Sequence, residues 1–163
     1  MSDFNPAEIE AIGFDLDNTL LDRNQAVHGW LGSVLGDQPD VLAEAIGYDN
    51  SGFISRPHFY NWLSERLDWA ANGAEVERRF QGEVFDFFEP NPDVVQFIRD
   101  LAATEIPLTL LTNGDASFQL SKFKLLGVDD CFKEHRRIAT GAIGFHKPDR
   151  RAFDAMINSV PAA

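Results

Sequence analysis

Two acidic residues near the N-terminus, Asp15 and Asp17, are spaced for chemistry within the segment GFDLDNTL (13–20). In a regular strand, positions i and i+2 face the same side, so we expect both carboxylates on one side of the chain. Such neighbours repel each other unless something uses them. They could bind Mg²⁺ through carboxylate oxygens, or one could attack as a nucleophile while the other transfers protons. A solvated Asp-rich turn is the simpler alternative.

Two later loops carry groups suited to a phosphate. Thr112, Asn113 and Gly114 offer a hydroxyl, an amide and an unhindered backbone N–H just before an expected helix, where anions bind readily. Lys147, followed by Pro148, offers a cation. Each loop alone is a weak signal, since Asn-Gly is also an ordinary turn. Together with the two acids they suit phosphoryl transfer, in which catalysis is largely positioning and charge neutralisation.

Short apolar segments stand just before each of these polar groups. We predict strands over Ile9–Leu16, Pro107–Leu111 and Arg136–Ala139, because ligands in open α/β sheets bind beyond the carboxyl ends of strands. Asn91-Pro92 predicts a helix start, and another helix is expected over Asp149–Asn158. The alternation predicts an α/β fold whose parallel sheet has right-handed crossovers.

Residues 23–89 follow a different pattern. Apolar residues recur there at helical spacing in three groups, 27–35, 59–67 and 76–88, which predicts three amphipathic helices. Their aromatic side chains are expected to pack a core rather than bind a cofactor. We therefore divide the chain into an α/β core, residues 1–22 and 90–163, and a small inserted helical subdomain, residues 23–89.

Composition excludes several partners. The 163 residues carry a formal net charge of −12, which argues against nucleic acid or an anionic membrane surface as the main partner. No apolar run approaches the roughly 20 residues of a membrane span, and the N-terminus lacks a signal-peptide pattern. The single Cys131 cannot form an internal disulfide, so we expect a cytoplasmic location and an incidental or structural role for this thiol.

The three polar segments together resemble the haloacid dehalogenase (HAD) superfamily. GFDLDNTL (13–20) resembles its first motif, LLTNG (110–114) its second, and GFHKPD (144–149) followed by Phe153 its third, in the branch with a helical cap between motifs one and two. The resemblance covers essentially the whole chain. It implies a three-layer, Rossmann-like parallel sheet, with residues 23–89 as a cap that covers the site and selects the substrate.

The resemblance also implies catalytic roles. Asp15 would be the nucleophile that forms an aspartyl-phosphate, and Asp17 would protonate the leaving group and then activate water. Mg²⁺ would bind the Asp15 carboxylate and the backbone carbonyl of Asp17. Lys147 would neutralise Asp15 and the phosphoryl group. Because a halide needs no proton to leave, an acid at Asp17 favours a phosphatase or phosphomutase over a dehalogenase.

The implied substrate ligands are the Thr112 hydroxyl and the Asn113 backbone, with Gly114 in the same loop and Lys147 opposite. The leading interpretation is a Mg²⁺-dependent phosphohydrolase that acts on a small phosphorylated metabolite. A catalytically impaired phosphate-binding or interaction protein is the alternative. A phosphomutase or a 2-haloacid dehalogenase variant is a further one.

One departure from the family pattern concerns the C-terminus. The family's fourth motif is an acidic pair after a fourth strand that lies beside the first, yet no acidic residue follows Asp154. We expect the C-terminal strands of the family sheet to be missing, through an incomplete product or a natural short form. Any metal is then expected to bind weakly. The protein would be a monomer, or a homodimer formed through the exposed sheet edge.

Overall fold

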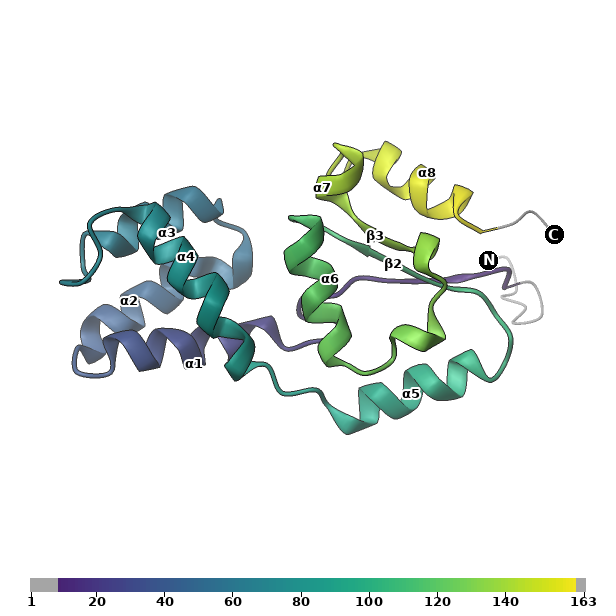
Figure 1. Ribbon diagram of the computed structural model, residues 1–163, viewed down its shortest axis with the longest axis horizontal. Coiled ribbons are helices and arrows are strands. Elements are labelled where there is room, and N and C mark those ends of the chain that lie inside the picture. The colour runs from purple at the N-terminus through teal and green to yellow at the C-terminus, as the bar shows by residue number, and fades with distance from the viewer. Residues whose placement is uncertain (1–8, 161–163) are drawn as a thin grey trace, which may run out of the picture. The chain divides into compact units, whose positions relative to one another are not determined.

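The computed structural model describes residues 9–160, which separate into two compact units (Figure 1). The α/β unit comprises residues 9–21 and 90–160 of the described chain, and the helical unit is Asp22–Glu89. No helix within residues 9–160 combines the length and the apolar character that crossing a membrane requires.

The α/β unit is built on a parallel sheet in the order β1-β2-β3. Its strands are β1 (Ile12–Phe14), β2 (Leu108–Thr112) and β3 (Arg137–Ala139). β1 pairs with β2, and β2 with β3, both in parallel register. The central strand β2 is buried along its whole length. The predicted α/β class and parallel sheet are therefore confirmed.

The first strand is shorter than predicted. It ends at Phe14, so Asp15 and Asp17 both lie in the loop that follows rather than in the strand. The second strand instead runs one residue beyond the prediction and includes Thr112. Both differences concern the strand ends that carry the polar groups.

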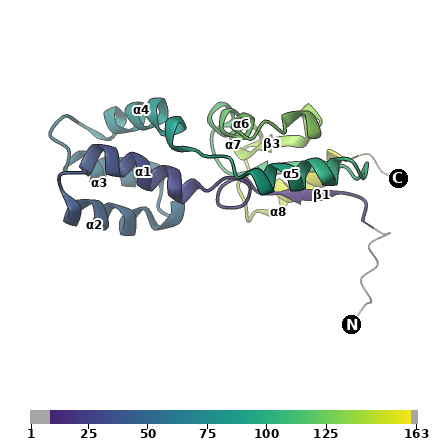
Figure 2. The same ribbon diagram turned by 90° about the horizontal axis from the view of Figure 1, so that it is seen from below.

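Side chains of β1 show why helices cover both faces of the sheet. A Cβ at Gly13 would lie 2.7 Å from the sulfur of Met156 in α8 (Arg150–Asn158), so this glycine lets α8 approach one face. The next residue, Phe14, points to the opposite face and packs edge-on against Phe132, which also packs against Phe123 of α6 (Ala116–Leu125). In Figure 2, α6 and α8 accordingly lie on opposite sides of the strands, which gives the expected three layers.

Helix starts in this unit follow their capping residues. Asn91 caps α5 (Pro92–Ala102) and accepts a hydrogen bond from the backbone N–H of Asp93, as its Asn-Pro sequence predicts. Asp115 caps α6 and Asp149 caps α8 in the same way. The remaining elements are α7 (Thr140–Ile143) and two 3₁₀ turns, η4 (Asp129–Cys131) and η5 (Glu134–Arg136).

The helical unit contains one more helix than the sequence pattern predicts. Its elements are α1 (Arg23–Leu35), α2 (Pro39–Asp49), η2 (Asn50–Gly52), α3 (Arg56–Ser64), α4 (Gly73–Glu83) and η3 (Val84–Phe87). The three predicted apolar stripes correspond to α1, α3, and α4 with η3. α2 escaped prediction because it buries only Ala45 and Asp49, so it shows no apolar stripe, and because Pro39 is its first residue rather than a break.

Aromatic packing and one ion cluster hold the helical unit together. Trp30 and Phe80 meet edge to face with ring centroids 5.0 Å apart, and Tyr60 packs on the same Phe80. Asp49 is fully buried and bonds Arg23 at 2.7 and 2.8 Å and Arg56 at 2.8 Å. Burial raises the pKa of Asp49, but the hydrogen bonds and charges of the two arginines outweigh it and hold that pKa below its usual range.

Candidate active site

The loop after β1 presents its two acids on either side of a buried anchor. Leu16, between them in sequence, is completely buried, and its carbonyl accepts the backbone N–H groups of Leu20 and Leu21 at 2.9 and 3.0 Å. Asn18, at φ 58°, supplies the left-handed residue this tight turn needs. The turn therefore fixes the main chain from Leu16 to Leu21, which includes Asp17 and directly follows Asp15.

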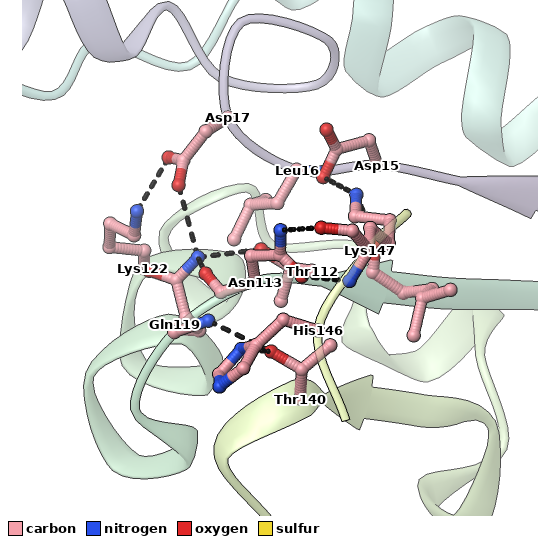
Figure 3. A network of polar contacts seen from close by, with 12 residues as sticks. Asp15, Leu16, Asp17, Thr112, Asn113, Gln119, Lys122, Thr140, His146 and Lys147 are labelled. Atoms are coloured by element: carbon pink, nitrogen blue, oxygen red, sulfur yellow. Dashed lines mark hydrogen bonds and ion pairs between the residues drawn. The ribbon is translucent and has the colours of Figure 1, made fainter. Parts of the chain in front are cut away.

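The expectation that both carboxylates face one side is wrong for this loop. It assumed a regular strand, whereas β1 ends before Asp15. Figure 3 shows Asp15 and Asp17 directed toward different partners, with Leu16 between them. Each carboxylate is paired with its own lysine, Asp15 with Lys147 and Asp17 with Lys122. Repulsion between the two acids is thus compensated without a shared cation.

Lys147 connects the first loop to the central strand. Its Nζ lies 2.7 Å from Oδ1 of Asp15 and donates to the carbonyl of Leu111 at 2.8 Å. The same Oδ1 accepts the backbone N–H of Leu16 at 2.7 Å. The Asp15 side chain nevertheless keeps 43% of its surface exposed. The structure therefore brings the predicted nucleophile and the predicted cation into contact and leaves the carboxylate accessible.

The side chain of Asn113 fixes the main chain around Lys147. Its Oδ1 accepts the Lys147 N–H at 2.8 Å, and its Nδ2 donates to the Lys147 carbonyl at 3.1 Å. The second and third predicted loops are thereby joined by a two-point amide bridge. This role of the side chain was not predicted, because the sequence offered the Asn113 amide as a phosphate ligand and the family resemblance pointed to the Asn113 backbone.

Gly114 is used differently from the sequence expectation. Its N–H donates to Oγ1 of the buried Thr140 at 3.2 Å, and its carbonyl accepts the N–H of Gly141 at 2.9 Å. A Cβ at Gly141 would lie 2.6 Å from that carbonyl, so the approach requires glycine there. Oγ1 of Thr140 also contacts Nδ1 of His146 at 2.8 Å. A role for Gly114 in substrate binding stays a prediction.

Asp17 lies against two side chains of α6 that sequence reasoning missed. Nζ of Lys122 is 2.5 Å from Oδ1 of Asp17, and Nε2 of Gln119 donates to Oδ2 at 3.0 Å. Nε2 of Gln119 also lies 2.6 Å from Oγ1 of Thr112 and 2.8 Å from the carbonyl of Asn113. Both residues are buried on the helix that was expected to follow Gly114. Their i, i+3 spacing, which puts two polar groups on one helix face, was the available signal.

The residues fit part of a Mg²⁺ site. The candidate ligands are the Asp15 carboxylate, whose side chain is 43% exposed and whose Oδ1 accepts the Leu16 N–H, and the main-chain carbonyl of Asp17. Two such oxygens, completed by water and phosphate, match the way Mg²⁺ is commonly held. The same residues contain no group of three or more His, Cys, Asp or Glu side chains that could hold a metal. The donor set of the described chain is therefore compatible with Mg²⁺ but small.

Cys131 lies outside this network. Partial burial raises the pKa of its thiol, and the adjacent Asp130 raises it further. Both effects disfavour the thiolate that a nucleophilic cysteine needs. This agrees with the incidental or structural role expected for Cys131.

Similar solved structures share this fold. A magnesium-bound Bacillus subtilis protein, YfnB, described as a HAD-type hydrolase, matches with a TM-score of 0.75 and 21% identity over 94% of this chain and 73% of its own. A HAD family hydrolase from Deinococcus radiodurans, with bound phosphate and sodium, gives 0.68 and 20% over 93% and 67%. L-2-haloacid dehalogenase from Xanthobacter autotrophicus gives 0.66 and 17% over 95% and 66%.

Sequence comparison supplies the family. No curated protein matches the chain. The model of the haloacid dehalogenase-like hydrolases matches residues 9–160, nearly the whole chain and all three of the loops that form the site. The chain therefore belongs to the haloacid dehalogenase-like hydrolase family.

Proposed function

We propose that this hydrolase is a Mg²⁺-dependent phosphatase that acts on small phosphorylated metabolites through Asp15. The observation that carries the proposal is the accessible Asp15 carboxylate with the Lys147 ammonium 2.7 Å away. Lys147 is hydrogen-bonded to Asn113, which directly follows Thr112 at the end of β2. A nucleophile, a cation and a hydroxyl thus converge at the carboxyl ends of parallel strands, where α/β proteins bind ligands.

In the first step, an oxygen of Asp15 attacks phosphorus and forms an aspartyl-phosphate. The bond from phosphorus to the leaving oxygen breaks, and the carboxyl proton of Asp17 passes to that oxygen, so an alcohol departs. Lys147 and the Thr112 hydroxyl stabilise the charge on the phosphoryl oxygens.

In the second step, Asp17 takes a proton from water as the water oxygen attacks the same phosphorus. The phosphorus–oxygen bond to Asp15 breaks, which releases inorganic phosphate and restores both carboxyl groups to their starting states. The net reaction converts a phosphate monoester and water into an alcohol and phosphate. The Asp15 carboxylate and the Asp17 carbonyl would hold Mg²⁺, which would supply additional neutralisation of phosphoryl charge. The helical unit would select the substrate as a cap.

Two other functions are tied to specific observations. The small metal donor set of the described residues favours an impaired phosphate-binding protein as the second candidate. The fold match with L-2-haloacid dehalogenase keeps dehalogenation as a third, although the proton donor at Asp17 is unnecessary for a halide leaving group.

The test is hydrolysis of p-nitrophenyl phosphate with and without Mg²⁺, by wild type and by Asp15→Asn. We expect Mg²⁺-dependent turnover that the substitution abolishes. Phosphate binding without turnover would support the binding protein. Halide release from a 2-haloacid would support the dehalogenase, and isomerisation of a sugar phosphate without net phosphate release would indicate a mutase.

A further inference from the structure

The least expected feature of the site is a pair of buried polar side chains, Lys122 and Gln119, one turn apart on α6. Each holds one carboxylate oxygen of Asp17, at 2.5 and 3.0 Å respectively. The Lys122 side chain is only 4% exposed, whereas the Asp17 side chain is 25% exposed. A nearly buried ammonium is costly unless it is paired. The Asp17 carboxylate offsets that cost, and the contact in turn holds the carboxylate against a helix.

The pair leaves Asp17 able to act. A carboxylate has about four lone-pair sites, and α6 occupies one on each oxygen. The remaining sites are available to carry or accept a proton. The contact therefore fixes the orientation of Asp17 without using up its capacity for proton transfer.

Gln119 connects this acid to the predicted phosphate loop. Its Nε2 has two protons but three acceptors within 3.0 Å, namely Asp17 Oδ2, Thr112 Oγ1 and the carbonyl of Asn113. Because Thr112 accepts from Gln119, its own hydroxyl proton is left for another acceptor, such as a phosphoryl oxygen. One amide group thus orients the proton carrier and a phosphate ligand together.

We propose that Lys122 and Gln119 are positioning residues for phosphoryl transfer, an inference that rests on the proposed phosphatase function. Lys122 aims the Asp17 carboxyl at the leaving oxygen, and Gln119 aims the Thr112 hydroxyl at the phosphoryl group. α6 is suited to this task, since only Asn113 and Gly114 separate its N-cap Asp115 from Thr112 at the end of β2. Neither residue touches substrate.

The role of Lys122 is tested by how strongly a variant depends on the leaving group. p-Nitrophenolate leaves without help, whereas phenolate, with a pKa of about 10 as in tyrosine, benefits from a proton. We expect Lys122→Met to lower kcat/KM for phenyl phosphate about tenfold more than for p-nitrophenyl phosphate, which is part of the roughly 100- to 10,000-fold contribution of a positioned acid. Lys122→Arg, which keeps the charge, should recover part of that difference.

The matched control is Lys124→Met, which removes the same charge from the exposed face of the same helix. It should leave the ratio of the two kcat/KM values unchanged. A purely structural role of Lys122 would reduce the amount of active enzyme and lower both values equally. Equal loss for the two substrates, or no loss, would overturn the proposal for Lys122.

Gln119 has a separate readout. We expect Gln119→Leu to raise the inhibition constant for inorganic phosphate about fivefold, about the value of one hydrogen bond, because the Thr112 hydroxyl loses its orientation. Lys122→Met should leave that constant unchanged, as should Gln96→Leu on the exposed surface of α5. An unaltered inhibition constant in Gln119→Leu would remove Gln119 from the proposal.

Failure of the inference can be told apart from failure of the proposed function. If the Asp15→Asn variant turns over substrate as fast as the wild type, the phosphatase mechanism is wrong, and the positioning roles are wrong with it. If turnover needs Asp15 but the substrate ratio is unchanged in Lys122→Met, only the present inference fails. A double-mutant cycle of Lys122→Met with Asp17→Asn in urea unfolding checks the contact without activity. Additive destabilisation would show that the two side chains do not interact, and would equally overturn the proposal.

Discussion

The two units use acid–base pairs in opposite ways. In the helical unit, Asp49 is fully buried, and two arginines contact it. In the α/β unit, Asp15 and Asp17 have one lysine each and keep 43% and 25% of their side chains exposed. The two arginines carry more positive charge than the single negative charge of Asp49, and the buried Asp49 side chain has no exposed surface that a ligand could reach. The other two carboxylates retain oxygens that a substrate, a metal or water can reach. The number of cations per acid, together with exposure, separates the structural cluster from the candidate site.

The largest expected difference concerns activity. Asp15→Asn should lower turnover of p-nitrophenyl phosphate by about 10⁴-fold or more, as loss of a nucleophile does. Its free energy of unfolding should change by no more than about 1 kcal/mol, since a half-exposed ion pair contributes little. Steady-state kinetics and urea unfolding of the same preparation measure both quantities. Full activity in this variant would show that the exposed Asp15 carboxylate is not the nucleophile.

The converse holds for Asp49. Asp49→Asn should reduce the free energy of unfolding by about 3–5 kcal/mol, because it leaves two guanidinium groups without their buried counter-charge. Urea unfolding measures this loss. Asp40→Asn, at an exposed position of the same helix α2, is the control and should change it by no more than about 0.5 kcal/mol. A stable Asp49→Asn protein would show that the cluster does not hold the unit together.

Lys147 should behave as a member of the site rather than of the scaffold. We expect Lys147→Met to lower kcat/KM about 100-fold, since the variant removes the cation beside Asp15 that is proposed to neutralise the phosphoryl group. Its unfolding free energy should fall by only about 1 kcal/mol. Kinetics beside Lys133→Met, a charge deletion at another exposed lysine, measure the difference. Equal kinetics in the two variants would remove Lys147 from the mechanism.

The smallest predicted effect is on pH dependence. Because the pKa of Asp49 is lowered in the folded state, its contribution to stability is present above the unfolded pKa of about 3.9. That contribution is lost as pH falls through the folded pKa. The stability gap between wild type and Asp49→Asn should be constant from pH 5 to 7 and narrow below about pH 4. Urea titrations across this range measure it. A gap that widened in acid would contradict the assigned charge state.

The sequence predicted what depends on local pattern. Strand and helix positions, the Asn91-Pro92 helix start and the parallel sheet follow from apolar periodicity and capping residues. Motif residues could be singled out because acids, Asn-Gly and Lys-Pro follow apolar segments. The contact between Asp15 and Lys147 was expected only from the family resemblance, since the spacing in the chain does not encode it.

What the sequence did not predict depends on contacts between distant residues. Lys122 lies 105 positions from Asp17 in the chain, and α6 reads as an ordinary amphipathic helix until the partner is known. The helix α2 carries too little buried apolar surface to produce a stripe. The different directions of Asp15 and Asp17 result from where β1 stops, and strand ends are poorly determined by local sequence.

The amide bridge between Asn113 and Lys147 has a consequence for how the chain can vary. It joins residues 34 positions apart, so the segment between them forms a loop whose two ends are held together by this bridge. Because the bridge is made to main-chain atoms of Lys147, the position of this lysine does not depend on the length of the segment between them. Residues inserted at the exposed positions 133–135 would lengthen this segment and leave the cation facing Asp15.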